Sequence, residues 1–355
     1  MTSSAHLTTQ GVWVVGATFG AWYARALKGY GLSAIVGQGG ETGRQIAREL
    51  ACDYFSSLEQ ALAHSHPACA VVAVRSSIIG GEGDNIARRL LQAGVPVLQE
   101  LPVHPQEVVN TLRIAKQQGV FFTVTPFYDQ MPTVRRFLRA ASRLSALSPV
   151  RSVEMRVSVQ TLHCALFILS DIVGAPSPLI SATPMAAQEK ILIGSTWQGV
   201  AVDIVVMNRF DAASPDDNSQ PLMQITLLSD EGELTLHSPF GQVIWERRLQ
   251  PPEPTWVTKD IQDGIEDETL LLTSPLSNEP GSVHLRRDME TAIRATLRRF
   301  IAAKEVDAAR LQRQLAVLKL WQAICMSGGH PQQCRLTPPR AIGIQLGLAD
   351  REEEI

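Results

Sequence analysis

Between residues 11 and 124, short apolar runs rich in β-branched residues alternate with segments whose apolar residues recur at helical spacing. The runs predict buried strands at residues 12–15, 33–36, 70–74, 95–98 and 120–124, with a weaker strand at Tyr54 and Phe55. The segments between them predict helices at residues 22–28, 44–50, 58–63, 85–92 and 107–117. This alternation is typical of βαβ units and predicts an α/β domain, a doubly wound parallel sheet with helices on both faces.

Beyond this point the pattern changes. Helices are predicted at residues 133–145, 162–173, 287–303 and 310–326, and a first strand at residues 152–159. Strands at residues 200–208, 223–229, 233–236 and 243–246 are interpreted as an antiparallel meander, with a hairpin turn at Asp230-Glu231-Gly232 and a long loop at residues 251–280. The sequence therefore predicts two domains: residues 1–130, and an α+β domain of residues 131–355 with a mostly antiparallel, open sheet. The open face would serve a dimer partner or a substrate, or pack on the domain's own helices.

Composition excludes several classes of protein. Apolar residues make up 45% and charged residues 19% of the 355 residues, which indicates a globular protein rather than a disordered one. The net charge is −3, from 32 basic and 35 acidic residues, so charge favours neither nucleic acid nor a membrane as a partner. The longest apolar stretch without a charge, residues 157–170, is too short to span a bilayer, which takes about 20 residues. Five scattered cysteines without C-x-x-C spacing favour a cytoplasmic protein without a structural metal.

The first predicted strand runs directly into Gly16-Ala17-Thr18-Phe19-Gly20 and then a helix, which is where the dinucleotide-binding turn of a Rossmann domain lies. Gly16 suits the tight turn, whereas Thr18 stands where a second glycine is usual, and its hydroxyl could bond a phosphate oxygen. The helix N-terminus would add free N–H groups. Gly16, Thr18, Phe19 and Gly20 are therefore candidate cofactor residues; the alternative is a tight turn without a ligand.

The second predicted strand ends without the acidic residue that would bind a ribose 2′-hydroxyl, and Glu41 lies well past the strand end. Gly40, Thr42 and Arg44 follow it. The hydroxyl of Thr42 and the guanidinium of Arg44 suit a 2′-phosphate, which favours NADP over NAD. The alternative for Arg44 is a solvated residue at the start of a helix.

Further candidates lie after the fourth and fifth predicted strands. Arg75 and Ser76 follow the fourth strand, and Gln99, Glu100 and Pro102 follow the fifth. Ligands of open α/β sheets bind at the carboxyl ends of the strands, so these residues are expected to point into the same crevice.

These motifs resemble a known group of enzymes. Glu100-Leu101-Pro102 stands where sugar-oxidising members of the glucose-fructose oxidoreductase/inositol dehydrogenase-like superfamily carry Glu-Lys-Pro. Within that superfamily, the chain is similar to the thiazolinyl imine reductases of siderophore assembly lines. The motifs that carry this resemblance are Gly16-Ala17-x-Phe19-Gly20, Val74-Arg75-Ser76, Gly80-Gly81-x-Gly83, Gln99-Glu100-x-Pro102-x-His104-Pro105, Phe127-Tyr128, Gly241-x-Val243-Ile244-Trp245, Leu320-Trp321-Gln322 and Leu336-Thr337-Pro338-Pro339.

The resemblance implies hydride transfer from NADPH to the C=N bond of a thiazoline, held as a thioester on a carrier domain of a nonribosomal peptide synthetase. The product would be a thiazolidine, as in the pyochelin and yersiniabactin pathways. The cofactor supplies the hydride, and the protein must deliver one proton to nitrogen. Leu101, at the position of the sugar dehydrogenases' lysine, cannot move a proton, which argues against alcohol oxidation. It also replaces a histidine of the similar reductases, so another proton donor is required.

Tyr128 is the first candidate for that donor, because it matches the family's Phe-Tyr and its phenol can donate a proton. His104 is a second candidate, or it only shapes a turn. His163 and Trp245 are candidate substrate residues, each with a place in the core as the alternative. Water could also protonate the nitrogen.

The sequence therefore predicts a cytoplasmic, NADPH-dependent imine reductase that acts on a carrier-bound siderophore intermediate. It is expected to be a homodimer through the second-domain sheet. Two alternatives remain: another oxidoreductase of the superfamily with a free small-molecule substrate, and a non-catalytic NAD(P)-sensing binding protein.

Overall fold

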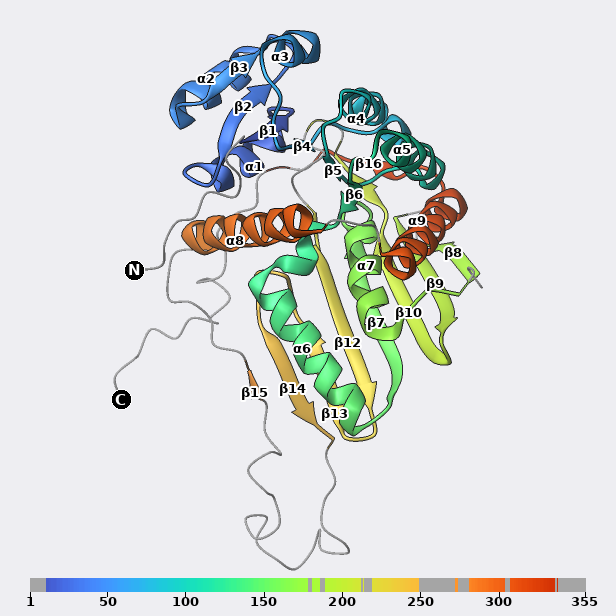
Figure 1. Cartoon of the computed structure of the whole chain (residues 1–355). Helices are drawn as coiled ribbons and strands as arrows, with labels where there is room; N and C mark the ends of the chain where they lie inside the picture. The colour runs from blue at the N-terminus through green and yellow to red at the C-terminus, as the bar shows by residue number, and fades with distance from the viewer. Residues whose placement is uncertain are drawn as a thin grey trace, which may run out of the picture.

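The computed structural model describes residues 11–177, 181–185, 189–211, 213, 219–248, 272–273, 281–303, 307–335 and 337. These residues form a parallel sheet with helices, stacked on a second and larger sheet (Figure 1). Most of the predicted loop at residues 251–280 and most of the motif at residues 336–339 lie outside the described residues.

The first sheet has the order β3-β2-β1-β4-β5-β6, and all of its pairs are parallel. Its strands are β1 (Val12–Val15), β2 (Leu32–Val36), β3 (Asp53–Phe55), β4 (Cys69–Val72), β5 (Val97–Glu100) and β6 (Phe122–Thr125). The helices between them are α1 (Gly20–Leu27), α2 (Glu41–Leu50), α3 (Leu58–His64), α4 (Gly83–Gln92) and α5 (Pro105–Gln118). All four residues of β1 are buried, as expected for a strand covered on both faces. The predicted doubly wound Rossmann sheet is confirmed, and its strand order reverses between β1 and β4.

The short 3-10 helix η2 (Phe127–Gln130) leads into the second sheet, which has the order β15-β14-β13-β12-β7-β10-β9-β8. Its strands are β7 (Val150–Ser158), β8 (Ser181–Met185), β9 (Lys190–Trp197), β10 (Val200–Met207), β12 (Met223–Ser229), β13 (Gly232–Leu236), β14 (Val243–Arg247) and β15 (Leu272–Thr273). Helices α6 (Pro132–Leu147), α7 (Leu162–Val173) and α9 (Ala308–Gly328) contact these strands. Buried and exposed residues alternate along β9 and β10, so one face of the sheet is solvated. The predicted α+β domain with a mostly antiparallel sheet is confirmed.

The predicted meander was wrong in one respect. Strand β7 lies between β10 and β12, and it pairs in parallel with β10. The antiparallel neighbour of β10 is β9, a strand that the sequence analysis did not predict. The turn between β9 and β10 consists of Gln198 and Gly199, both with positive φ (50° and 86°). That geometry is typical of a tight two-residue hairpin.

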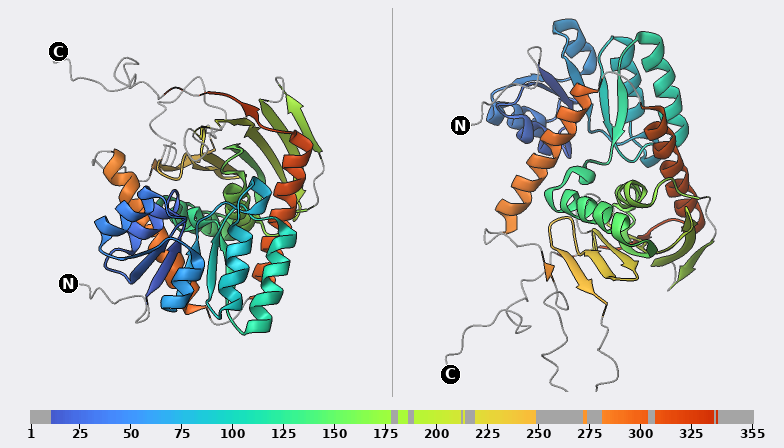
Figure 2. Two further views of the ribbon diagram at one scale, coloured as in Figure 1. Left: turned by 90° about the horizontal axis from the view of Figure 1, so that it is seen from above. Right: turned by 60° about the horizontal axis from the view of Figure 1, so that its bottom comes forward.

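Two helices return from the second half of the chain to the first domain, as the right-hand view of Figure 2 shows for α8 (Gly281–Ala302). Helix α8 packs on α1 and η2, and the Nε–H of Arg294 donates to the carbonyl of Ala26 at 2.7 Å. Helix α9 packs on α7 and α5. The predicted domain boundary after residue 130 falls between η2 and α6 and stays a prediction. No helix among the described residues has the length and apolar character that a membrane span requires.

Candidate cofactor and active site

A cleft of about 1850 Å³ runs along the carboxyl ends of β1, β2, β4 and β5. Residues of η2, the start of α7 and the end of α9 are also among those that line it, so both halves of the chain contribute to the cleft. The cleft lies where the strand order of the Rossmann sheet reverses, the place at which open α/β sheets bind their ligands.

The turn from β1 to α1 forms one end of the cleft. Gly16 has φ +105°, and a Cβ there would lie 2.7 Å from the carbonyl oxygen of Ala73 on the neighbouring strand's end, so only glycine fits. Thr18 and Phe19 line the cleft, and Thr18 is exposed. Gly20 begins α1 but is buried and does not line the cleft; a Cβ there would lie 3.2 Å from Val14. Gly20 therefore serves close helix–strand packing, whereas the other three candidates face the space.

At the end of β2, Gly40 and Thr42 line the cleft, and no carboxylate directly follows the strand. The side chain of Glu41 is paired with Arg48 on the same helix. Arg44 does not itself line the cleft, but its guanidinium carbon lies 5.7 Å from the centroid of the Tyr54 ring, which does.

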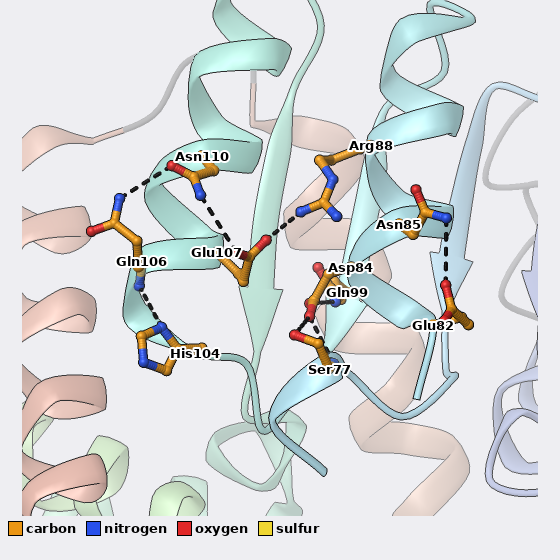
Figure 3. Close-up of polar contacts among 10 residues, drawn as sticks. All are labelled: Ser77, Glu82, Asp84, Asn85, Arg88, Gln99, His104, Gln106, Glu107 and Asn110. Carbon is orange, nitrogen blue, oxygen red and sulfur yellow. Dashed lines mark hydrogen bonds and ion pairs between the residues drawn. The ribbon is translucent and has the colours of Figure 1, made fainter. Parts of the chain in front are cut away.

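The loop after β4 brings Arg75 and Ser76 to the cleft and is held by a buried carboxyl group. Figure 3 shows Asp84 of α4 accepting three hydrogen bonds. The donors are the backbone N–H and hydroxyl of Ser77, at 2.8 and 2.6 Å, and the side-chain amide of Gln99, at 2.7 Å. Gln99 thus points away from the cleft, which corrects the expectation that it faces the crevice.

Glu100 ends β5 and lines the cleft. The buried hydroxyl of Tyr23 in α1 donates to its carboxyl group. Burial raises the pKa of Glu100 to about 8, although the hydrogen bond from Tyr23 opposes this shift. Leu101 follows as an apolar, buried part of the wall, and Pro102 also lines the cleft, with its carbonyl bonded by the Ser76 hydroxyl.

Tyr128 lies on η2 and also lines the cleft. Its ring stacks on Phe127 at 4.6 Å between centroids, and Phe127 in turn contacts Phe19 and Tyr23. Burial raises the pKa of the Tyr128 phenol, and the nearby Cys164 and Glu100 raise it further. The phenol is therefore a hydrogen-bond donor whose anion is strongly disfavoured.

His104 begins α5 as its N-cap. Its Nδ1 accepts the backbone N–H of Gln106 at 3.1 Å, as Figure 3 shows, and its Nε2 lies 2.8 Å from the side-chain amide of Gln322 in α9. A neutral imidazole that accepts at Nδ1 carries its proton on Nε2, so Gln322 should present its amide oxygen there. Both ring nitrogens are thereby engaged, and His104 caps α5 while it lines the cleft.

His163 is buried at the start of α7, where burial lowers its pKa to about 4 and keeps the imidazole neutral at pH 7. Its ring meets Trp321 edge to face, with 6.1 Å between the centroids. Both residues line the cleft. Trp245 does not: it lies on β14, paired with Leu234 and Leu272.

The sequence analysis did not identify the wall that α9 forms. Trp321, Gln322 and Cys325 all line the cleft, and their spacing of one and then three residues puts them on one helix face. Cys164, the neighbour of His163, was also missed. The helical spacing was visible in the sequence, but nothing in it placed that face opposite β5.

A Rossmann sheet whose cleft is closed by an α+β domain is an arrangement in which dinucleotides commonly bind at the carboxyl ends of the strands. Residues 11–125 match the model of GFO/IDH/MocA, the oxidoreductase family with an NAD-binding Rossmann fold. No curated protein matches the sequence significantly.

Solved structures share this fold at low sequence identity. An oxidoreductase from Agrobacterium radiobacter in complex with NAD+, L-tartaric acid and magnesium has a TM-score of 0.66 and 12% identity, over 90% of this chain and 96% of that one. A variant of a 3-ketoreductase from Actinomadura kijaniata, in complex with TDP-benzene and NADP, has a TM-score of 0.65 and 14% identity, over 92% and 100%. A myo-inositol dehydrogenase from Corynebacterium glutamicum has a TM-score of 0.61 and 13% identity, over 90% and 96%. The family match and the shared fold support a Rossmann-type oxidoreductase that uses a nicotinamide cofactor.

Proposed function

We propose that this protein reduces the C=N bond of a thiazoline to a thiazolidine, with NADPH as the hydride donor and with the substrate held as a thioester on a carrier domain. The observation that carries this proposal is the set of residues that line the cleft, where the phenol of Tyr128 and the carboxyl group of Glu100 occur together with the apolar Leu101. Leu101 cannot act as the base that alcohol oxidation needs at that position, whereas the hydroxyl of Tyr128 can donate a proton. The raised pKa values of Glu100 and Tyr128 agree with a donating role.

The residues present fit a dinucleotide. The glycine-only turn at Gly16 and the following helix N-terminus suit a pyrophosphate. A 2′-phosphate would meet Thr42, which lines the cleft, and Arg44, whose guanidinium lies near the cleft residue Tyr54. Pro102 and Glu100 would then adjoin the nicotinamide end, because the adenosine end takes the side of β2. When bound, the cofactor supplies the hydride.

The protein's own task is to place a proton at the substrate nitrogen. Tyr128 presents a phenol to the cleft from a short helix that is fixed by aromatic packing, and we assign it as the hydrogen-bond donor to that nitrogen. The buried side chains of Leu101 and Trp321 give the cleft an apolar part of its wall. His104 and His163 line the wall in this assignment and do not donate the proton.

The preference for NADPH can be tested with Arg44→Ala. Loss of one charge-assisted contact to the 2′-phosphate should weaken NADPH binding about 10-fold and leave NADH binding unchanged. Arg48→Ala is the matched control, because Arg48 lies one turn further along α2, is bound to Glu41 and does not line the cleft. Titration of each variant by nucleotide fluorescence gives the two affinities. Equal losses for NADPH and NADH would refute the assignment.

The reaction itself is tested by mixing the protein with NADPH and an aryl-thiazolinyl-thiazoline thioester, either on a carrier domain or on N-acetylcysteamine. Loss of NADPH absorbance with formation of the thiazolidine is the expected result. Turnover of a free ketone or sugar alone would move the assignment to another reductase of the same fold. Tight NADPH binding without turnover of any imine would favour a sensor of the cofactor.

We also propose a homodimer through the solvated face of the second sheet. Exposed and buried residues alternate along β9 and β10, and Asp203 of β10 and Leu192 of β9 lie on the exposed face. Sedimentation equilibrium should give twice the chain mass.

A further inference from the structure

Glu100 has no cationic partner among the residues that the structure describes. Its carboxyl group accepts a hydrogen bond from Tyr23 of α1, and the other groups near it are the phenol of Tyr128 on η2 and the thiol of Cys164 on α7. Asp129, the next residue on η2, is 3.1 Å from Arg299 of α8, so that cation is already engaged. His163 lies beside Cys164 and is held neutral. Within the described part of the chain, the groups near Glu100 are therefore neutral or acidic, and none of them compensates the charge of a carboxylate there.

Tyr128 cannot supply the reaction's proton alone. Its surroundings raise the pKa of the phenol, so a phenolate left behind would be costly. The proton that Tyr128 passes to a substrate must be replaced within the cleft. Of the carboxyl groups that line the cleft, Glu100 is the one whose charge acts on the Tyr128 phenol.

We propose that Glu100 is the proton source of the reduction and that it changes its charge together with the cofactor: a neutral acid opposite NADPH, and a carboxylate opposite the cationic nicotinamide of NADP+. This inference rests on the proposed function for its chemical step and for the place of the nicotinamide beside Glu100, and it does not rest on the identity of the imine. In that step the substrate carbon takes the hydride and its nitrogen takes a proton from the Tyr128 hydroxyl. The O–H bond of Glu100 breaks as Tyr128 is reprotonated. NADPH is oxidised, the imine is reduced, and solvent later returns one proton to Glu100.

The charge change of Glu100 can be measured as proton release on nucleotide binding, without a substrate. Below pH 8 Glu100 is mostly protonated in the free protein, because its pKa is about 8. A cation beside it lowers that pKa, so binding of NADP+ should release a proton near pH 7, up to about 0.9 per site. Binding of NADPH should release none from Glu100, because the reduced ring is neutral. The 2′-phosphate is the same in both nucleotides, so its contribution cancels in the difference.

The experiment is calorimetric titration of the full-length protein with NADP+ and with NADPH at pH 7, in two buffers of different ionisation enthalpy. Wild-type protein should release roughly one proton more with NADP+ than with NADPH. Glu100→Gln keeps the acceptor for Tyr23 and removes the titration, so the difference should vanish while both nucleotides still bind. Glu107→Gln is the matched control, an acid of α5 that is paired with Arg88 outside the cleft, and it should keep the wild-type difference.

A second variant keeps the carboxyl group of Glu100 and removes the hydrogen bond that it accepts. The hydrogen bond from Tyr23 lowers the pKa of Glu100, so Tyr23→Phe should move the pH range of proton release upward without abolishing it. Equal proton release for the two nucleotides in wild-type protein, or a difference that survives in Glu100→Gln, would overturn the inference. The titrations contain no imine, so failure of the thioester assay and failure of this inference are separate results.

Discussion

Replacing Tyr128 with phenylalanine should lower kcat for imine reduction by about 100-fold or more, the typical contribution of one general acid. The ring packs on Phe127 at 4.6 Å and should stay in place, because the change removes only the hydroxyl. KM and the affinity for NADPH should therefore change little. Stopped-flow measurement of NADPH oxidation under single-turnover conditions isolates the chemical step.

Tyr30→Phe is the matched control for that variant. Tyr30 lies after α1, outside the cleft. The guanidinium carbon of Arg294 lies 4.1 Å from the centroid of its ring, a contact that a phenylalanine ring retains. Its kcat should equal that of wild type. If the Tyr128 variant keeps full activity, water delivers the proton and the assignment of Tyr128 is wrong.

Replacing Asp84 with alanine should destabilise the protein by about 3 kcal/mol, because three hydrogen bonds to a buried carboxyl group are lost together. Asp84 is 2% exposed and Gln99 is fully buried, so the freed amide of Gln99 would have no access to water. Its side-chain oxygen already lacks a partner among the described residues. The melting temperature should fall by roughly 6 °C, measured by differential scanning calorimetry.

The loop that Asp84 holds also lines the cleft, so NADPH affinity should fall in the same variant. Asn110→Ala is the control: Figure 3 shows Asn110 bonded to Gln106 along one exposed face of α5, at 3.1 Å. Its effect should stay within about 0.5 kcal/mol. Equal melting temperatures for the two variants would mean that the Asp84 network does not support the fold.

The first sheet could be predicted from the sequence because each of its strands is a short apolar run that can be recognised without knowing its partner strand. A run such as Val12-Trp13-Val14-Val15 is apolar on both faces, and its helix follows directly. The second sheet was harder, because pairing there depends on residues far apart in the chain. Strand β7 pairs with β10 some fifty residues later, as Val153 with Val202, and no local pattern distinguishes that partner from β12.

The same reasoning applies to the cleft. Gly16, Thr18, Glu100 and Tyr128 follow strand ends, and topology alone brings such positions to one edge of the sheet. The direction in which a side chain points could not be predicted from topology alone. Gln99 precedes Glu100 in β5, but strand alternation sends its side chain to Asp84 on the opposite side. The α9 wall depends on tertiary packing that one sequence does not reveal.

The return of α8 and α9 to the first domain also sets an order of events during synthesis. His104 meets Gln322 across 218 residues, and Asp129 meets Arg299 across 170. A nascent chain that has completed the Rossmann sheet can already shape its phosphate turn, yet its substrate wall emerges from the ribosome only with α9. The cleft is thus complete only when nearly all of the described chain has been made.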